Sequence, residues 1–367
     1  MARGYETVRV EMPSNGFFTH VLECQGHDES HGAVFDFHWA PTSYGTDRWL
    51  MATASGDHSV RVFGLPSGKH IRTLFKQGGH VEWVTFCAVL NTGDILSAGL
   101  DGRVIRWPRG SARGMEVAQL GSIAAGAFCE KTQAVFVCGS HATICYFEHG
   151  NYLWQASVLP TVKSAPNLTT CCIGSKYLGV GGRDGGVFIV SKTDGNVIWK
   201  KKVFTQSVLA STSFQHFFVF GGADGRIIFI PTTEDCATSG EYQSFDGNGR
   251  GRVTSFAQDE DLLFVGLSDG SVLIYEQYEG AISHVDTLEI LGRMPILSLA
   301  LRFVNRNYLI YCGHSDGTLT IWNHGEGALV LKMPISKGAI NKLRINEEAQ
   351  ILVAAGDDAI VRILQMQ

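Results

Sequence analysis

The apolar and polar positions along this chain follow one pattern that recurs eight times. Each repeat is an apolar run rich in β-branched or aromatic residues, a few small residues, a turn and a second apolar run. The eight segments read MATASGDHSVRVF, ILSAGLDGRVIRW, VFVCGSHATICYF, LGVGGRDGGVFIV, FVFGGADGRIIFI, LFVGLSDGSVLIY, IYCGHSDGTLTIW and LVAAGDDAIVRIL. Two short apolar runs joined by a tight turn predict a β-hairpin.

One residue marks the turn of each segment, and its spacing is regular. Successive turn residues are 44, 40, 43, 40, 45, 47 and 41 positions apart, and a bulky residue stands six positions after each. The turn residues are Asp57, Asp101, His141, Asp184, Asp224, Asp269, Asp316 and Asp357. Asp-Gly supplies the positive φ of a hairpin turn, and the Asp side chain bonds nearby amides. We therefore interpret the carboxylates of the seven turn Asp residues as structural rather than catalytic.

Two further strand-like runs lie between successive hairpins. One precedes each hairpin, as in VEWVTFCAV, and one follows it, as in HIRTLFK. Four strands in roughly 40–45 residues are typical of a β-propeller blade. Runs such as IIFI are apolar on both faces, and blades packed face to face would cover both. The sequence predicts an all-β protein: one closed β-propeller domain, residues 1–367, with eight four-stranded blades and seven as the alternative.

The eighth repeat lacks a fourth strand, because the chain ends at Gln367 just after the last hairpin. The run FFTHVLEC at 17–24 alternates its side chains as an extended strand does. We predict that 17–24 pairs with the strand near 360–365 and closes the ring, which removes free sheet edges. Residues 5–12 are a second candidate or an added strand.

Composition narrows the function classes. The formal net charge is −5, so the basic excess typical of nucleic-acid binders is absent. The net charge does not exclude a local basic patch. There is neither an apolar run of membrane-spanning length nor the apolar core of a signal peptide. The nine Cys lie in apolar runs without zinc-ligand spacing. We expect a cytoplasmic or nuclear protein that is not secreted, with no membrane insertion, metal or cofactor.

The second repeat carries the best match to a known family. It has His80 after Gly79, then Ser97, Asp101 at the turn and Trp107. This pattern resembles the WD-repeat family, in which such a His, Ser, Asp and Trp form a hydrogen-bonded tetrad inside a blade. The first repeat keeps His27, Thr53 and Asp57, with Phe63 in place of Trp. The resemblance covers nearly the whole chain and implies the fold rather than a particular function.

A second, weaker resemblance is to quinoprotein-like propellers. Residues 150–154 (GNYLW) and 195–199 (GNVIW) are similar to their Gly-x-x-x-Trp motifs, and Cys171-Cys172 is similar to the vicinal pair of some quinone-dependent dehydrogenases. Those enzymes are exported and bind calcium through acidic ligands. The other interpretation is packing between blades by Trp154 and Trp199, with two thiols on opposite faces of one strand.

The candidate interface consists of the loops that enter the first strand of each blade and the residue just before each turn Asp. A Trp among basic residues is typical of a protein-binding surface. The candidates are Trp83, Arg183, Arg250, Arg252, Arg293 and Lys337. Their alternative role is inter-blade packing for Trp83 and ordinary solvent exposure for the cations.

The sequence favours a non-catalytic scaffold or adaptor. Such a protein binds partner proteins or peptides on the propeller rim, as a subunit of a larger complex. The alternatives are a propeller enzyme of the quinoprotein-like type and a nucleic-acid-binding propeller with Trp83 as a stacking group.

Overall fold

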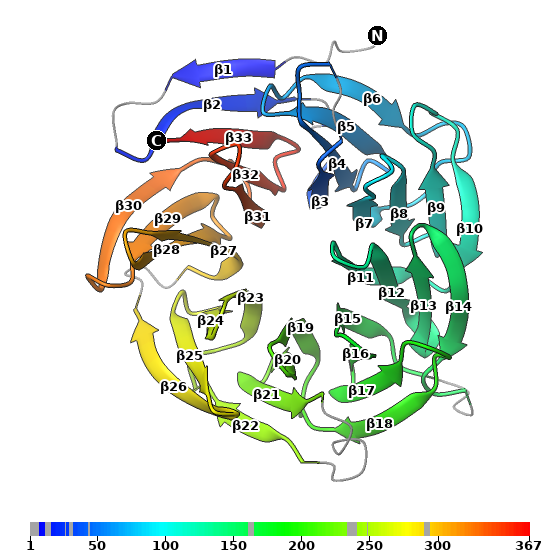
Figure 1. Ribbon diagram of the computed structural model, residues 1–367, viewed down its shortest axis with the longest axis vertical. Helices are drawn as coiled ribbons and strands as arrows, with labels where there is room; N and C mark the ends of the chain where they lie inside the picture. The colour runs from blue at the N-terminus through cyan, green and yellow to red at the C-terminus, as the bar shows by residue number, and fades with distance from the viewer. Residues whose placement is uncertain are drawn as a thin grey trace. The chain divides into compact units, whose positions relative to one another are not determined.

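The computed structural model describes residues 7–11, 16–25, 27–28, 32–42, 45–160, 165–232, 241–247, 249–289 and 294–367. In these residues the regular elements are β-strands and one short 3-10 helix, η1 (Ser140–Ala142). The strands form eight antiparallel sheets, so the prediction of an all-β propeller with eight blades rather than seven is confirmed (Figure 1). The chain divides into two compact units, Met1–Val117 with Leu297–Gln367, and Ala118–Ile296.

The first unit holds blades 1, 2, 7 and 8. Blade 8 has five strands in the order β31-β32-β33-β2-β1. Blade 1 consists of β3 to β6, blade 2 of β7 to β10 and blade 7 of β27 to β30, each in chain order. The strands are β1 (Thr7–Glu11), β2 (Phe18–Cys24), β3 (Val34–Ala40), β4 (Trp49–Ser55), β5 (Val60–Leu65), β6 (His70–Leu74), β7 (Val84–Val89), β8 (Ile95–Gly99), β9 (Arg103–Trp107), β10 (Met115–Gln119), β27 (Ile296–Val304), β28 (Asn307–His314), β29 (Thr318–Asn323), β30 (Ala328–Pro334), β31 (Ile340–Asn346), β32 (Ile351–Gly356) and β33 (Val361–Met366).

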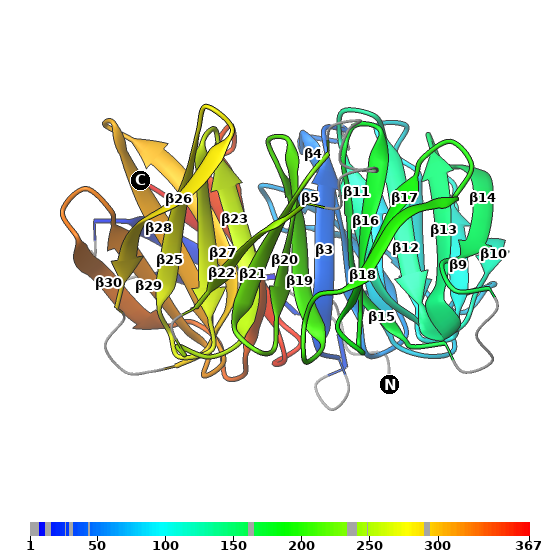
Figure 2. The same ribbon diagram turned by 90° about the horizontal axis from the view of Figure 1, so that it is seen from below.

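The second unit holds blades 3 to 6, each with four strands in chain order. Blade 3 consists of β11 to β14, blade 4 of β15 to β18, blade 5 of β19 to β22 and blade 6 of β23 to β26. Within this unit the strands of a blade lie side by side along their length, as Figure 2 shows for β12 and β13 of blade 3. The strands are β11 (Ile123–Cys129), β12 (Ala134–Gly139), β13 (Thr143–Glu148), β14 (Asn151–Ser157), β15 (Leu168–Ile173), β16 (Tyr177–Gly182), β17 (Gly186–Ser191), β18 (Val197–Lys202), β19 (Val208–Phe214), β20 (Phe217–Gly222), β21 (Arg226–Pro231), β22 (Gln243–Asp246), β23 (Val253–Asp259), β24 (Leu262–Leu267), β25 (Val272–Tyr278) and β26 (Ala281–Leu288).

Apolar clusters join successive blades inside each unit. Phe37 of blade 1 packs in one cluster with Ile363 of blade 8, and Val62 of blade 1 packs in another with Trp107 of blade 2. The middle strands are buried on both faces, as in β12 and β20, where every residue is buried. This is the physical reason for strands that are apolar on both faces.

The predicted closure strand is confirmed. β2 pairs antiparallel with β33, with Cys24 opposite Val361 and Phe18 opposite Met366. β1, the second candidate in the sequence, is an added fifth strand that pairs with β2. The contact carries an ion pair, since Arg362 Nε donates to Glu23 Oε1 at 3.0 Å. Both ends of the chain therefore share blade 8.

A β-bulge recurs near the start of the first strand of a blade. In β15 the extra residue is Thr169, whose hydroxyl donates to the carbonyl of Val208 in the next blade at 2.6 Å. In β31 it is Asn341, whose amide donates to the carbonyl of Val34 at 3.1 Å. Since a bulge turns a side chain out of the regular alternation, the bulge residue reaches the neighbouring blade.

Candidate functional site

In blade 2 the structure brings together the four residues that the resemblance grouped. His80 Nδ1 lies 3.0 Å from Asp101, and His80 Nε2 lies 2.8 Å from Ser97 Oγ. The indole nitrogen of Trp107 donates to the same hydroxyl at 2.8 Å. Burial alone would raise the pKa of Asp101, but the hydrogen bond from His80 and backbone amides outweigh it and lower that pKa.

The tetrad also fixes the loop that leads into β7. The backbone N–H of Val81 donates to Asp101 Oδ2 at 3.1 Å, and the carbonyl of Trp83 accepts from Leu100 at 2.8 Å. A side chain at Gly99 would put its Cβ 2.6 Å from that carbonyl, so this close approach needs glycine. The loop is therefore held by backbone contacts on both sides of residue 82.

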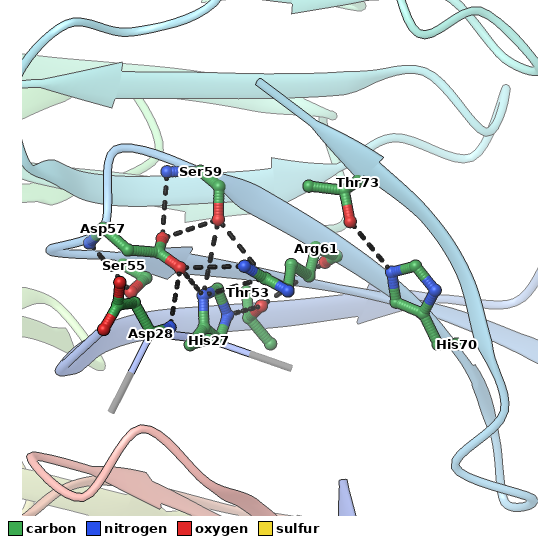
Figure 3. A network of polar contacts seen from close by, with 9 residues as sticks. All are labelled: His27, Asp28, Thr53, Ser55, Asp57, Ser59, Arg61, His70 and Thr73. Carbon is green, nitrogen blue, oxygen red and sulfur yellow. Dashed lines mark hydrogen bonds and ion pairs between the residues drawn. The ribbon is translucent and has the colours of Figure 1, made fainter. Parts of the chain in front are cut away.

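Blade 1 contains an altered version of the tetrad (Figure 3). His27 lies 2.9 Å from both Asp57 Oδ2 and Thr53 Oγ1. Phe63 replaces the Trp, and Arg61 fills the space beside the imidazole. The Arg61 guanidinium donates to Asp57 Oδ2 at 2.9 Å and to His27 Nδ1 at 3.1 Å. The sequence analysis did not identify Arg61; its signal was an Arg four residues after a turn Asp, inside an apolar strand.

The charges of this cluster are strongly coupled. Burial lowers the pKa of His27, and the Arg61 charge adds to this effect against the opposing effect of Asp57. For the Asp57 carboxyl, burial opposes ionisation, but His27, Ser59 and Arg61 together hold its pKa well below the usual range. The buried charges at neutral pH are therefore the Asp57 carboxylate and the Arg61 guanidinium.

His70 lies at the edge of the same cluster (Figure 3). Its Nε2 is 3.1 Å from the Thr73 hydroxyl, and its ring packs edge-on against Phe63 with centroids 5.5 Å apart. Burial and then the Arg61 charge lower the pKa of His70 to about 4. The ring is neutral at pH 7 and acts here as a packing and hydrogen-bonding group.

Both clusters place a hydroxyl, an imidazole and a carboxylate in a row, as catalytic triads do. However, Thr53 and Ser97 are fully buried, and Ser97 Oγ already accepts the Trp107 indole N–H. A nucleophile must reach its substrate. In this arrangement the hydroxyls bind their own blade, and the geometry supports a structural role for the two clusters.

An exposed apolar cluster lies beside the blade 2 tetrad. Trp83 is 47% exposed and its ring packs at a tilt against that of Phe35, with centroids 5.4 Å apart. Val81 is 67% exposed. Phe35 is the bulge residue of β3, the position that elsewhere reaches the next blade through a hydrogen bond. Here the link is made by two aromatic rings, one of which faces solvent.

The predicted cations differ in exposure and in their hydrogen-bond partners. Arg183, Arg252 and Lys337 are exposed. Arg250 is half-buried and donates to Glu289 Oε1 at 2.8 Å. Arg293 lies outside the described residues. Trp83 therefore contacts Phe35, which sequence reasoning missed, and it shares its loop with a second exposed apolar residue, Val81.

The turn carboxylates bond their own hairpins in repeats 1, 2 and 4 to 7. Asp184, for example, accepts the Gly186 N–H at 3.0 Å. The others that accept the amide two positions on are Asp57, Asp101, Asp224, Asp269 and Asp316.

In the eighth repeat the turn position is Asp358 rather than the predicted Asp357. Asp358 accepts the Ile360 N–H at 3.3 Å, whereas Asp357 accepts from the Asn341 amide at 2.8 Å. Ala359 has the positive φ, 64°, that Gly or His58 has in other repeats. This corrects the alignment of the last repeat by one residue.

Four turn carboxylates also anchor the loop that enters their blade. Asp101 binds the N–H of Val81 in this way, and Asp358 binds that of Lys337 at 3.2 Å. The other two pairs are Asp57 with Asp28 and Asp224 with Thr205. The same residue therefore fixes the hairpin turn and the neighbouring loop, which a sequence pattern shows only as a turn.

The residues behind the quinoprotein resemblance have packing roles. Trp154 Nε1 donates to the Lys192 carbonyl of the next blade at 2.7 Å, and its ring lies 5.5 Å from that of Tyr146. Trp199 is half-buried beside a cluster that joins blades 4 and 5. Cys171 and Cys172 are buried on opposite faces of β15 and belong to different clusters.

Blade 7 shows a broken tetrad. Trp322 pairs with Ile310 as Trp107 pairs with Ile95, and Cys312 stands where blade 2 has Ser97. The buried indole nitrogen of Trp322 has no hydrogen-bond partner among the described residues. Since a buried unpaired donor is destabilising, the Ser-to-Cys difference between the two blades accounts for the unpaired group.

Cys312→Ser is expected to raise the free energy of unfolding by about 1 kcal/mol, because the hydroxyl provides the acceptor that Trp322 lacks. Urea denaturation measures the change. Cys145→Ser is the matched control, a buried strand cysteine that pairs with Val137 and is not beside an unpaired indole. Equal destabilisation by both substitutions would contradict the prediction.

Within the described ranges, no helix is long and apolar enough to cross a bilayer. The same residues contain no group of three or more His, Cys, Asp and Glu side chains arranged to hold a metal ion.

These sheets and turn networks define the class of protein, an eight-bladed β-propeller. No protein-family model matches the chain, so its membership of the WD-repeat family stays a prediction. The chain is similar in structure to the computationally designed protein Ika8, with a TM-score of 0.71, 20% identity and coverage of 92% of this chain and 98% of that one. This likeness shows the fold alone.

A similarity in sequence covers a smaller part of the chain. Over 102 residues, 28% of its length, the chain is 32% identical to the ubiquitin fusion degradation protein 3 homolog of Caenorhabditis elegans. The match spans about a tenth (10%) of that relative's length.

Proposed function

We propose that this chain is a non-catalytic protein-interaction scaffold, a subunit of a larger assembly, and that it binds partner proteins through the cluster of Phe35, Val81 and Trp83. The carrying observation is that Trp83 is half-exposed on a loop fixed by the blade 2 tetrad. Trp is enriched among residues that dominate binding energy. A loop that is already ordered loses little entropy on binding.

Trp83→Ala tests the proposal. We expect it to weaken partner binding about tenfold or more, which is the usual effect of removing a Trp anchor. The measurement is quantitative affinity purification with the wild-type and variant chains, followed by titration of each recovered partner. The C. elegans relative is named for the degradation of ubiquitin fusions, so a ubiquitin fusion protein is included as a defined probe.

Tyr278→Ala is the matched control, because Tyr278 is an exposed aromatic residue (70%) at the end of β25 and is not part of this loop. It should leave the same partners bound. Both variants should keep the wild-type melting temperature, since each side chain is substantially exposed. Equal partner recovery by wild type and Trp83→Ala would show that the binding surface lies elsewhere.

A further inference from the structure

Each blade ends in an outer strand with one edge unpaired in its own sheet. Such edges can add a strand from another chain, and natural proteins guard them with charges, proline or bulges. The guards on seven outer strands are Arg9 on β1, Arg72 on β6, Glu116 on β10, Lys200, Lys201 and Lys202 on β18, Asp246 on β22, His284 and Asp286 on β26, and Lys332 and Pro334 on β30. Strand β14, NYLWQAS, has no Asp, Glu, Lys, Arg or His residue and no proline.

The side chains of β14 that reach solvent are apolar or neutral. Tyr152 is 48% exposed and Leu153 is 49% exposed. The ring of Tyr152 packs against Phe147 on one face of the sheet, while Trp154 packs against Tyr146 on the other. Leu153 lies between them as the extra residue of a bulge. The edge therefore presents a large aliphatic side chain and no charge.

The bulge is not what distinguishes β14, because other outer strands have it too. The extra residues there are Ile71 in β6, Ile198 in β18, Val285 in β26 and Val330 in β30. Val285 is the nearest equivalent of Leu153, since it is 46% exposed. It stands between His284 and Asp286, whereas Leu153 has two uncharged neighbours. The distinguishing feature of β14 is its neutrality.

We propose that β14 is a self-association edge, where it pairs antiparallel with β14 of a second copy of this chain. In an antiparallel two-fold pair, a charge on or beside the axis lies close to the same charge of the second copy. A strand that is neutral throughout can oppose itself without this repulsion. An axis at Trp154 sets Asn151 opposite Ser157, an amide against a hydroxyl, and Tyr152 opposite Ala156, a large residue against a small one.

The interface is small, so the dimer is weak, with a dissociation constant on the order of 100 μM. Sedimentation velocity over a concentration series spanning this value measures it. We expect a reversible shift from monomer to dimer with the wild-type chain. Leu153→Lys and Leu153→Glu should each raise the dissociation constant at least tenfold, because each copy then brings a like charge to the axis. An equimolar mixture of the two variants should restore the dimer.

Val285→Lys is the matched control at the same bulge position of β26, and it should leave the dissociation constant unchanged. Trp83→Ala should also leave it unchanged, so the outcome is independent of the proposed scaffold function. The proposal is overturned if the wild-type chain stays monomeric across the series. It is also overturned if the mixture of Leu153 variants fails to dimerise, or if Val285→Lys weakens the dimer as much as Leu153→Lys does.

Discussion

Truncation of residues 1–26 is expected to destabilise the protein by about 5 kcal/mol or more, because the deletion removes the strand that pairs with β33. Phe18, Val21 and Cys24 of β2 are buried, and each buried apolar side chain contributes roughly 1.5–3 kcal/mol. The deletion also exposes the edge of β33, which invites pairing with other chains. Thermal unfolding and light scattering would show a lower melting temperature and aggregation.

Deletion of residues 1–4 is the control, because these residues lie outside the described strands. The shorter deletion should leave the melting temperature unchanged. A monodisperse 27–367 chain that melts at the wild-type temperature would show that β2 does not hold blade 8 together.

Asp57→Ala is expected to lower the free energy of unfolding by about 3–5 kcal/mol at pH 7, because the buried Arg61 guanidinium then loses the carboxylate that balances its charge. Arg61 is 8% exposed, and its guanidinium donates to Asp57 at 2.9 Å. Since the pKa of Asp57 is below its ordinary value, this stabilisation is present above about pH 4 and is lost as the pH falls further. Denaturant titration at pH 7 measures the full effect.

Asp101→Ala provides the comparison, with an expected loss of only about 1–3 kcal/mol, because it leaves hydrogen-bond donors unpaired and no buried Arg. Arg61→Met in the Asp57→Ala background should recover at least about 2 kcal/mol by removing the uncompensated charge. Equal losses for the two Asp variants, together with no recovery, would place the stability of blade 1 outside this ion pair.

Most of the fold was predictable from the sequence because the turn residues mark the hairpins. Asp-Gly pairs mark the hairpins, and Gly102, Gly185 and Gly225 have the positive φ that these turns require. The residues of β2 were predictable as a strand from their alternation and as the partner of β33 from the missing fourth strand of the eighth repeat. These features are local, or follow from counting strands, so no tertiary information was needed.

The register of the last hairpin could not be predicted from the sequence, because both faces of its strands are buried. Ile363 and Leu364 are both buried, each against a different neighbouring blade. A shift by one residue exchanges the faces of a strand, but here either alignment buries an apolar residue. The hydrogen bonds of Asp358 and the positive φ of Ala359 decide the alignment.

The sequence by itself determined the eight repeats, the positions of their turns, the closure strand and Trp83 as an interface candidate. The tertiary structure decided which residues accompany them: Arg61 beside His27, Phe35 beneath Trp83, and the neutral edge of β14. The reason is distance along the chain. Turn and strand signals act within a few residues, whereas Phe35 and Trp83 meet only because the bulge in β3 turns a side chain toward the next blade.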